Sequence, residues 1–280
     1  MSRLGQVASI FRYPVKTLQG ESVYSIAVTE LGFEGDRLWA LRDEKRGDFG
    51  GGKRIVPLMN LSAQMGAAGA APTIELPNGQ RFAADDPDAS RLLSEALDHP
   101  VTIWPVGATP EPPAKVEEVT DLEADFRAAM GREGDEPNPD FSQIPESMMA
   151  YLGKGGRPYV DLAPLLVMTQ QSLDALSRVA TSSQIDVRRF RPSFVIDADV
   201  ESAFPEQGWI GARIRVGGAI FQLPMTCPRC VMTTRGFSDL PKDPGIMRKL
   251  VTEAGGNLGV YGTIEQVGTI SVGDTVERLD

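Results

Sequence analysis

The sequence predicts a mainly β protein with a few helices, an α+β fold in which an N-terminal β-barrel-like region precedes a second β-rich domain. Short segments of alternating polar and apolar residues recur about every ten residues, with glycines between them as turns. The length of 280 residues suits about two domains of ordinary size. We therefore expect three regions, at residues 1–107, 108–150 and 151–280.

The first region is expected to contain mostly short strands. Asn78-Gly79 separates two strand-like halves and predicts a hairpin over residues 73–82, because Asn-Gly favours the tight turn of a hairpin. Apolar residues at helical spacing predict a helix over residues 89–97. Further strands are expected at residues 6–13, 23–28, 37–43 and 101–106.

The middle region, 108–150, has a different composition. Between Glu111 and Glu146 it has eleven acidic residues, only three basic ones and several prolines. We expect an acidic connector with one short helix at residues 122–130. A lid, or a docking face for a basic partner, is the alternative interpretation.

The second half returns to strands. Thr169 or Gln170 is expected to lead from an apolar strand into a helix over residues 171–179, where apolar side chains recur at helical spacing. The expected strands are residues 165–168, 194–196, 212–221 and two within 263–278, around a turn at 272–274.

Charge and hydropathy exclude some classes of partner. The chain has 28 Lys and Arg against 38 Asp and Glu, a net charge of −10. Nucleic acids and anionic membranes bind clusters of Lys and Arg, so we expect neither as a partner. No stretch approaches the roughly 18 apolar residues of a membrane span, and the first thirteen residues lack a signal-peptide core. We expect a cytoplasmic protein.

The scarcity of cysteine and histidine excludes several kinds of site. Two Cys and one His cannot supply the four ligands of a closed zinc site or the four Cys of an iron–sulfur cluster. His99 is the one available histidine base, and nothing near it resembles a nucleophile elbow. We expect His99 to be a surface turn residue before Pro100.

The motif Cys227-Pro228-Arg229-Cys230 carries the most chemical information. Such a pair can be a redox couple, part of a metal site, one reactive thiolate or a structural pair. A thioredoxin-type couple needs a helix that begins at the pair, whereas residues 231–234 are rich in β-branched side chains and predict a strand. Arg229 favours the thiolate of Cys230, which is the form that ligates a soft transition metal.

Basic residues lie where the expected strands start or end. They are Lys16, Arg37 and the Arg cluster of residues 188–191. If they converge, they would form a positive pocket for a phosphate-bearing cofactor. Residues 47–54 have the spacing of a P-loop, but Arg54 replaces the Ser or Thr that binds Mg²⁺. We expect there a loop with a positive tip near the mouth of the site.

Several motifs occur together and in a fixed order. The chain resembles the two-part MOSC (molybdenum cofactor sulfurase C-terminal) proteins over nearly its whole length, and is similar in pattern to the mitochondrial amidoxime reducing component and its bacterial counterparts. The motifs are Tyr13-Pro14-Val15-Lys16-Thr17, Gly35-Asp36-Arg37-Leu38-Trp39, Phe190-Arg191-Pro192, Cys227-Pro228-Arg229-Cys230 and Val267-Gly268-Thr269-Ile270-Ser271-Val272-Gly273-Asp274.

The resemblance implies an N-terminal MOSC β-barrel region at 1–107, an acidic connector or lid at 108–150 and a MOSC domain at 151–280. It also implies a molybdenum pyranopterin cofactor (molybdenum–molybdopterin), with Cys230 as the catalytic residue and metal ligand. The residues that it places at the pterin and its phosphate are Lys16, Thr17, Arg37, Arg191, Ser193 and Arg229.

The implied reaction is two-electron reduction of N-hydroxylated compounds such as amidoximes, hydroxylamines or hydroxamic acids. Because the chain has no iron–sulfur cluster or Rossmann fingerprint of its own, the electrons would come from a separate electron-transfer protein or reductase, for which the acidic segment is a candidate dock. The chain departs from the family pattern at Ala163 (often Ser), Ser193 (Asn) and Pro228 (often Ser or Thr), and no acid follows Thr233-Thr234-Arg235.

Two alternatives use the same residues differently. A sulfur-transfer protein would carry a persulfide on Cys230 and need no molybdenum. A repurposed module would bind a phosphorylated ligand in the arginine pocket, and Cys230→Ser would then leave binding intact.

Overall fold

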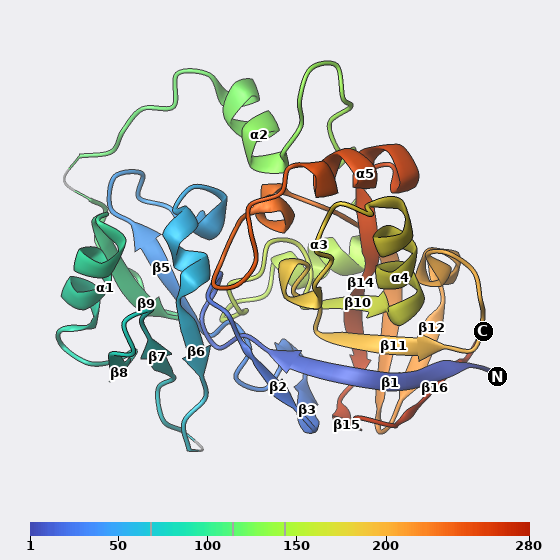
Figure 1. Ribbon diagram of the computed structural model, residues 1–280. Coiled ribbons are helices and arrows are strands. Elements are labelled where there is room, and N and C mark those ends of the chain that lie inside the picture. The colour runs from blue at the N-terminus through green and yellow to red at the C-terminus, as the bar shows by residue number, and fades with distance from the viewer. Residues whose placement is uncertain (68, 114, 143) are drawn as a thin grey trace.

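The computed structural model describes residues 1–67, 69–113, 115–142 and 144–280, and its secondary structure confirms the mainly β fold with a few helices. Among these residues, seven strands close into a barrel (Figure 1). The order around the barrel is β11 (Phe194–Ala198), β10 (Leu165–Thr169), β14 (Asn257–Gln266), β13 (Ala219–Pro228), β12 (Arg213–Val216), β16 (Thr275–Arg278) and β1 (Ser2–Arg12).

The strand β1 closes this barrel. It pairs antiparallel with β16 on one side and with β11 on the other, and its far end also pairs with β2 (Glu21–Val23). A Cβ atom at Gly5 would lie 2.1 Å from the carbonyl oxygen of Asp197, so the approach of β1 to β11 requires glycine. The barrel therefore contains strands from both ends of the chain, and the boundaries expected near residues 107 and 150 stay a prediction.

A second sheet also joins the two ends of the sequence. Here β15 (Gly268–Ser271) pairs with β3 (Ser25–Thr29), which pairs with β4 (Gly32–Phe33). The barrel strands and this sheet share one apolar core, in which the side chains are almost fully buried. Its members include Trp209, Phe33, Phe194, Phe221, Ile10, Ile196, Ile214 and Leu223.

The rest of the first region forms a smaller unit beside the barrel (Figure 1). It has its own apolar core, which contains Leu58, Ile74 and Leu93. Its elements are the pair β5 (Trp39–Asp43) and β9 (Val101–Pro105), the sheet of β6 (Ser62–Gln64), β7 (Thr73–Glu75) and β8 (Arg81–Ala83), the helix α1 (Ala89–Leu97) and the 3-10 turns η1 (Gly51–Lys53) and η2 (Val56–Asn60).

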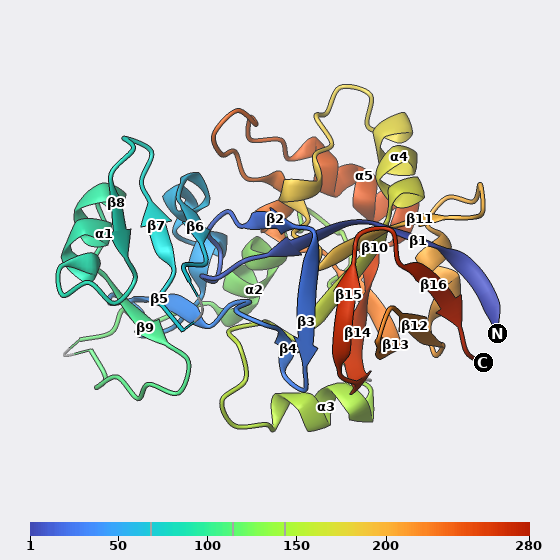
Figure 2. The ribbon, with the colours of Figure 1, turned by 90° about the horizontal axis from the view of Figure 1, so that it is seen from below.

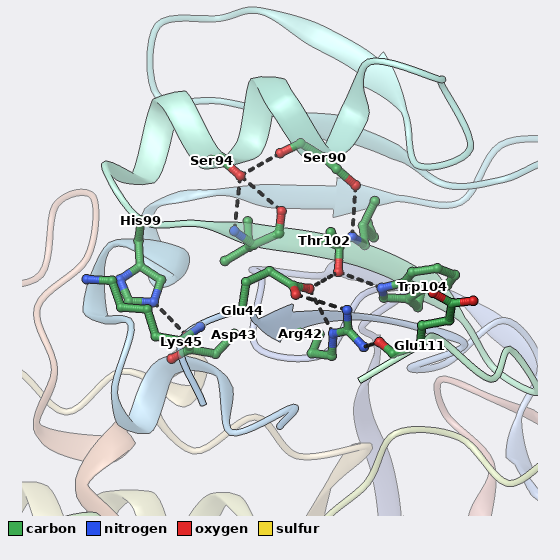
Figure 3. Close-up of polar contacts among 12 residues, drawn as sticks. Arg42, Asp43, Glu44, Lys45, Ser90, Ser94, His99, Thr102, Trp104 and Glu111 are labelled. Carbon is green, nitrogen blue, oxygen red and sulfur yellow. Dashed lines mark hydrogen bonds and ion pairs between the residues drawn. The ribbon is translucent and has the colours of Figure 1, made fainter. Parts of the chain in front are cut away.

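A polar network holds this unit together (Figure 3). The carboxylate of Glu44 accepts hydrogen bonds from the Arg42 guanidinium at 2.8 and 2.9 Å and from the Thr102 hydroxyl. Trp104 donates its indole N–H to the same hydroxyl at 2.6 Å. We call Arg42, Glu44, Thr102 and Trp104 the β5–β9 network.

Four more helices lie around the barrel. Figure 2 shows α3 on the opposite side of the barrel from α4 and α5, and in Figure 1 α2 lies above the junction between the barrel and the smaller unit. A further apolar core, which includes Leu176, Ile246 and Leu250, packs α4 and α5 against the outer face of the barrel. The helices are α2 (Leu122–Met130), α3 (Glu146–Leu152), α4 (Gln170–Val179) and α5 (Gly245–Ala254).

The helix predictions agree with the structure where the sequence has clear end signals. The expected helices at 89–97 and 122–130 coincide with α1 and α2, and the expected helix at 171–179 is α4. Asp121 caps α2, because its side chain accepts a hydrogen bond from the Ala124 amide. Thr169 caps α4, because its hydroxyl accepts a hydrogen bond from the Ser172 amide. The hairpin at 73–82 is also confirmed.

The prediction of a strand at residues 231–234 was wrong, because these residues form the 3-10 turn η5 (Val231–Thr234). The hydroxyls of Thr233 and Thr234 donate to the backbone carbonyls three residues earlier, at 3.1 and 2.8 Å. Such local hydrogen bonds compete with the ladder of a sheet. The Cys motif therefore begins in the last two residues of β13 and leads into a helical turn.

Three predicted strands are divided or shortened. The run 212–221 is the hairpin of β12 and β13, with Gly217-Gly218 as its two-residue turn. The run 23–28 breaks at Tyr24, where β2 ends and β3 begins. Arg37 lies in a turn before β5 and has a left-handed backbone, with φ at 51°.

Candidate functional site

A cavity of about 530 Å³ lies between the end of β13, the first turn of the chain after β1 and the helix α2. The first region contributes Lys16, Thr17, Arg37 and Lys53 to its lining. The last region contributes Arg189, Arg191, Arg229 and Cys230. Asp161 is the one acidic residue in the lining, so the walls have an excess of positive charge.

Two arginines from distant parts of the chain meet at Tyr13. The guanidinium carbons of Arg37 and Arg191 lie 4.7 and 4.2 Å from the centre of the Tyr13 ring. Asp36 forms an ion pair with Arg37, and one of its oxygens accepts the Tyr13 amide at 2.7 Å. Both guanidinium groups are partly buried, and among the described residues only Arg37 has a carboxylate partner, which leaves the charge of Arg191 uncompensated.

The backbone near these arginines is strained. Among the described residues, six that are not glycine have positive φ angles, and three of them line the cavity: Thr17 (78°), Arg37 (51°) and Arg191 (56°). A β-branched residue such as Thr17 is rarely found there. Arg191 holds this turn, because it donates to the carbonyls of Thr17 and Leu18 at 3.0 and 2.6 Å. Strain of this kind concentrates at functional sites.

Two buried donors in the cavity lack a partner. Arg191 Nη2 and Arg229 Nε have no hydrogen-bond acceptor among the described residues. Burial, together with the positive charge of Arg37, lowers the pKa of Arg191 to about 10. A bound anion would supply the missing acceptor and offset the repulsion between the two arginines. The residues present therefore fit an anionic group such as a phosphate.

The two cysteines differ in their access to the cavity. Cys227 is buried, burial raises the pKa of its thiol, and its sulfur lies 3.0 Å from Arg229 Nη1. Cys230 is only partly buried and precedes η5 as its N-cap residue. Both side chains are free thiols. Cys230 is thus the thiol that a bound group can reach more readily.

A carboxylate bridges two lysines in the same cavity. Asp161 accepts from Lys16 Nζ at 2.9 Å and from Lys53 Nζ at 2.7 Å. Desolvation alone would raise the pKa of Asp161, but the two ammonium groups outweigh it and hold that pKa below its usual range. Asp161 is therefore ionised at neutral pH and fixes the positions of the two ammonium groups.

The structure brings six of the seven expected site residues together, since Lys16, Thr17, Arg37, Arg191, Arg229 and Cys230 all line the cavity. Ser193 is not in the lining. It is buried, and its hydroxyl accepts the Leu166 amide at 3.1 Å, which fixes β10 beside the segment that follows Arg191. Ala163 and Pro228, two of the departures from the family pattern, are in the lining.

Other residues of the site had only weak signals in the sequence. Tyr13 and Asp36 belong to the motifs that carry the resemblance, but only the fold shows that they hold the arginines. Asp161 interrupts an apolar run, and Lys53 is the positive tip of the 47–54 loop, which does reach the cavity. Phe126 also lines the cavity, but nothing in the sequence of the acidic segment around it indicates this contact.

The lone histidine lies away from the cavity. His99 Nε2 is 2.8 Å from the carboxylate of buried Asp43, so His99 is half-buried in its turn and not simply a surface residue (Figure 3). In the described part of the chain, no three His, Cys, Asp or Glu side chains are grouped to hold a metal ion. No helix of the described residues has the length and apolar character needed to cross a membrane.

The connector is attached to both parts of the molecule. Asp125 on α2 pairs with Arg46 at 3.0 Å and with Arg54 at 2.7 Å. Further along, Arg248 of α5 pairs with Glu133 and Glu136, each at 3.0 Å. Three of the eleven acids are thus paired with arginines of this chain.

Two family descriptions match the sequence. The description of the MOSC N-terminal β-barrel domain matches residues 4–100, and that of the MOSC domain matches residues 155–277. Residues 101–154, which include α2 and most of the acidic segment, lie outside both matches.

Curated relatives with low identity share a name. Mitochondrial amidoxime reducing component 2 of Homo sapiens is 31% identical over 43% of this chain and 38% of the relative, and that of Bos taurus is 26% identical over the same shares. The chain thus spans about two fifths of the first relatives it matches. Mitochondrial amidoxime-reducing component 1 of Mus musculus is 23% identical over 100% of this chain and 84% of the relative.

Solved structures give weaker likenesses. The YUAD protein from Bacillus subtilis has 9% identity and a TM-score of 0.44, over 98% of this chain and 94% of that chain. YiiM from Escherichia coli has 12% identity and a TM-score of 0.33, over 42% of this chain and 55% of that chain.

Proposed function

Because the chain belongs to the MOSC proteins that begin with an N-terminal MOSC β-barrel domain, we propose that it binds a molybdenum pyranopterin and reduces N-hydroxylated compounds. The names of the curated relatives, which describe amidoxime reduction, support this reaction. The cavity is the observation that carries the proposal, since it combines a strained cationic cradle with the more accessible thiol.

Each lining residue has a role in this proposal. Lys16, Thr17, Arg37, Arg191 and Arg229 would hold the anionic pterin, because they surround the unpartnered donors. Ser193 would support Arg191 from behind through its hydrogen bond to β10. The sulfur of Cys230 would ligate molybdenum, and the bound metal supplies two-electron chemistry that removes oxygen from an N–OH group.

The overall reaction needs electrons and protons as well as the substrate. An amidoxime, R–C(=NOH)–NH2, takes up two electrons and two protons, and the N–O bond breaks to give an amidine and water. The electrons would come from a separate electron-transfer protein or reductase. The protons would come from the solvent. Lys16 and Lys53 are N–H donors in the cavity, and the ionised Asp161 orients them.

The acidic segment would form the docking face for a basic donor protein. Asp125, Glu133 and Glu136 are engaged in ion pairs within this chain. The exposed acids with no ion pair among the described residues therefore form the face, and they include Glu117, Glu118, Asp121, Glu123 and Asp135.

The test is elemental analysis for molybdenum on protein from a host that makes the cofactor. We expect near-stoichiometric molybdenum in the wild type and its loss in Cys230→Ser, with reduction of benzamidoxime by a chemically reduced viologen lost in parallel. Cys227→Ser is the matched control: Cys227 also lines the cavity but is more deeply buried than Cys230, so this variant should keep its molybdenum.

Two outcomes would overturn the proposal. If the wild type holds no molybdenum although the host supplies the cofactor, the cavity serves another group, and cyanide-labile sulfur on the metal-free protein would point to a persulfide on Cys230. If Cys230→Ser retains full molybdenum, Cys230 is not the ligand.

A further inference from the structure

The cavity has aromatic side chains in its lining as well as basic ones, and we call them its aromatic wall. Phe126 and Met130 of α2 line it, together with Phe141 and Ile144 from the segment that follows. These four residues lie outside both family matches. The wall is thus a feature of this chain's connector, which the motifs shared with the family do not specify.

The two rings of the wall contact each other and leave surface open. The centres of the Phe126 and Phe141 rings are 6.3 Å apart with an angle of 76° between their planes, an edge-to-face pair. The side chain of Phe126 remains 37% exposed although it lines the cavity. In a segment with eleven acids, an open aromatic surface that faces a cavity is suited to contact with an apolar ligand.

The wall is fixed relative to Cys230. Gly131 ends α2, and a Cβ atom added there would lie 3.2 Å from the Cα of Val231, the residue after Cys230. The residue beside Phe126, Asp125, is held by Arg46 and Arg54 of the first region. Because α2 is attached at Asp125 and at its C-terminal end, the Phe126 ring forms a preformed surface in the cavity that Cys230 also lines.

We propose that Phe126 and Phe141 select N-hydroxylated substrates whose substituent is aromatic. This inference rests on the proposed function, because it assigns the substrate class of that same site. The substituent lies against the two rings, while the N–OH group is directed toward the basic side of the cavity, where Cys230 lies. Ala163 and Pro228 in the lining add apolar surface to the same cavity.

A matched pair of substrates tests the selection. Benzamidoxime and acetamidoxime have the same reacting group and differ only in a phenyl or a methyl substituent. In Phe126→Ala we expect KM for benzamidoxime to rise about tenfold with kcat unchanged, because lost apolar contact in a pocket changes discrimination by that order. The values for acetamidoxime should change less than twofold.

The control variant is Leu122→Ala. Leu122 lies one helical turn before Phe126 on α2, is 76% exposed and does not line the cavity. It should leave KM for both substrates unchanged. Phe141→Ala and Phe126→Leu provide further variants in case Phe126→Ala does not fold, and molybdenum content and thermal unfolding are measured for each.

The outcomes separate this inference from the proposed function. If the molybdenum-loaded wild type reduces neither amidoxime, the proposed function fails. If the loaded wild type reduces both, and the Phe126 and Phe141 variants alter neither KM or alter both KM values equally, the aromatic selection is overturned and the proposed function stands. An equal effect of Leu122→Ala would also overturn the selection.

Discussion

The β5–β9 network and the cavity both bury arginine, but they differ in how its charge is compensated. Arg42 is 7% exposed and donates to both oxygens of Glu44 and to the Glu111 carbonyl at 2.6 Å. No buried nitrogen or oxygen of that network lacks a partner within the described residues (Figure 3). In the cavity, Arg191 and Arg229 each keep an unpartnered donor, and the carboxylate of Asp36 pairs with Arg37 but not with Arg191.

The difference separates a stabilising role from a binding role. In the β5–β9 network each buried donor already has an acceptor within the protein. Such a network holds two strands together and offers no free donor to a ligand. In the cavity, donors lack acceptors and the backbone is strained, so the surrounding fold must hold the cluster in place. Binding of an anion should therefore stabilise the cavity more than the network. The comparison therefore predicts opposite responses to mutation and to ligand.

The largest effect is expected from removing a cavity arginine. Inorganic pyrophosphate should raise the thermal midpoint of the metal-free wild type, because a ligand that binds only the folded state stabilises it. In Arg191→Met the affinity for pyrophosphate should fall about 100-fold, since hydrogen bonds to charged groups contribute about 1.5–3 kcal/mol each. Titration followed by thermal unfolding measures both quantities.

Arg42→Met is the matched control for that experiment. It removes a guanidinium whose partners all belong to the protein, so the free energy of unfolding should fall while the affinity for pyrophosphate stays the same. If the two variants lost pyrophosphate affinity equally, the cavity and the β5–β9 network would not differ in anion binding, and the comparison would be wrong.

A smaller effect is expected within the β5–β9 network. Thr102→Val keeps the shape of the side chain but removes the hydroxyl that joins Glu44 to Trp104. The indole N–H then loses its acceptor, and we expect a loss of about 1–3 kcal/mol in the free energy of unfolding, measured in urea. Molybdenum content should not change. Full stability in this variant would show that the network does not hold β5 to β9.

The smallest effect concerns a buried carboxyl that belongs to neither cluster. Glu206 accepts from Thr169 and Ser172 at 2.6 and 2.5 Å, and its other oxygen has no partner among the described residues. Burial raises the pKa of Glu206 above its ordinary value of 4.5. The folded state then holds this proton to higher pH than the unfolded state does, so stability falls as pH rises above about 4.5.

Glu206→Gln should remove this contribution. The difference in stability between variant and wild type should therefore shift in favour of the variant as pH rises from 4.5 to 8, as urea unfolding at several pH values would show. A difference that stays constant across this range would mean that Glu206 has the same pKa in both states. Glu206 also sharpens the comparison, because one of its two oxygens lacks a partner among the described residues although the residue lies outside the cavity lining.

Local signals in the sequence were sufficient for some elements and insufficient for others. The helix α2 could be placed at 122–130 because Asp121 and Gly131 mark its two ends. The run 212–221 could not be divided from its alternation alone, since the pattern continues through the Gly217-Gly218 turn. Residues 231–234 have strand-forming side chains, but their hydroxyls bond to the local backbone instead.

For the site, the sequence supplied the residue types but not their arrangement. Lys16, Arg37 and Arg191 came from motifs, and their convergence depended on β1 lying beside β11, a pairing between strands about 190 residues apart, as the register of Gln6 with Asp197 shows. The contact of the Phe126 ring with the cavity depends on how α2 packs against η5, which no spacing within the connector reveals.

The closure of the barrel by β1 has a consequence for biosynthesis. The strand β1 emerges from the ribosome before both of its barrel neighbours, since β11 begins at Phe194 and β16 only at Thr275. Both edges of β1 in the barrel thus stay unpaired until those residues are made, and such long-range pairing slows folding. A nascent chain must keep this strand from other partners until β16 is made, so conditions that slow elongation should expose it to aggregation.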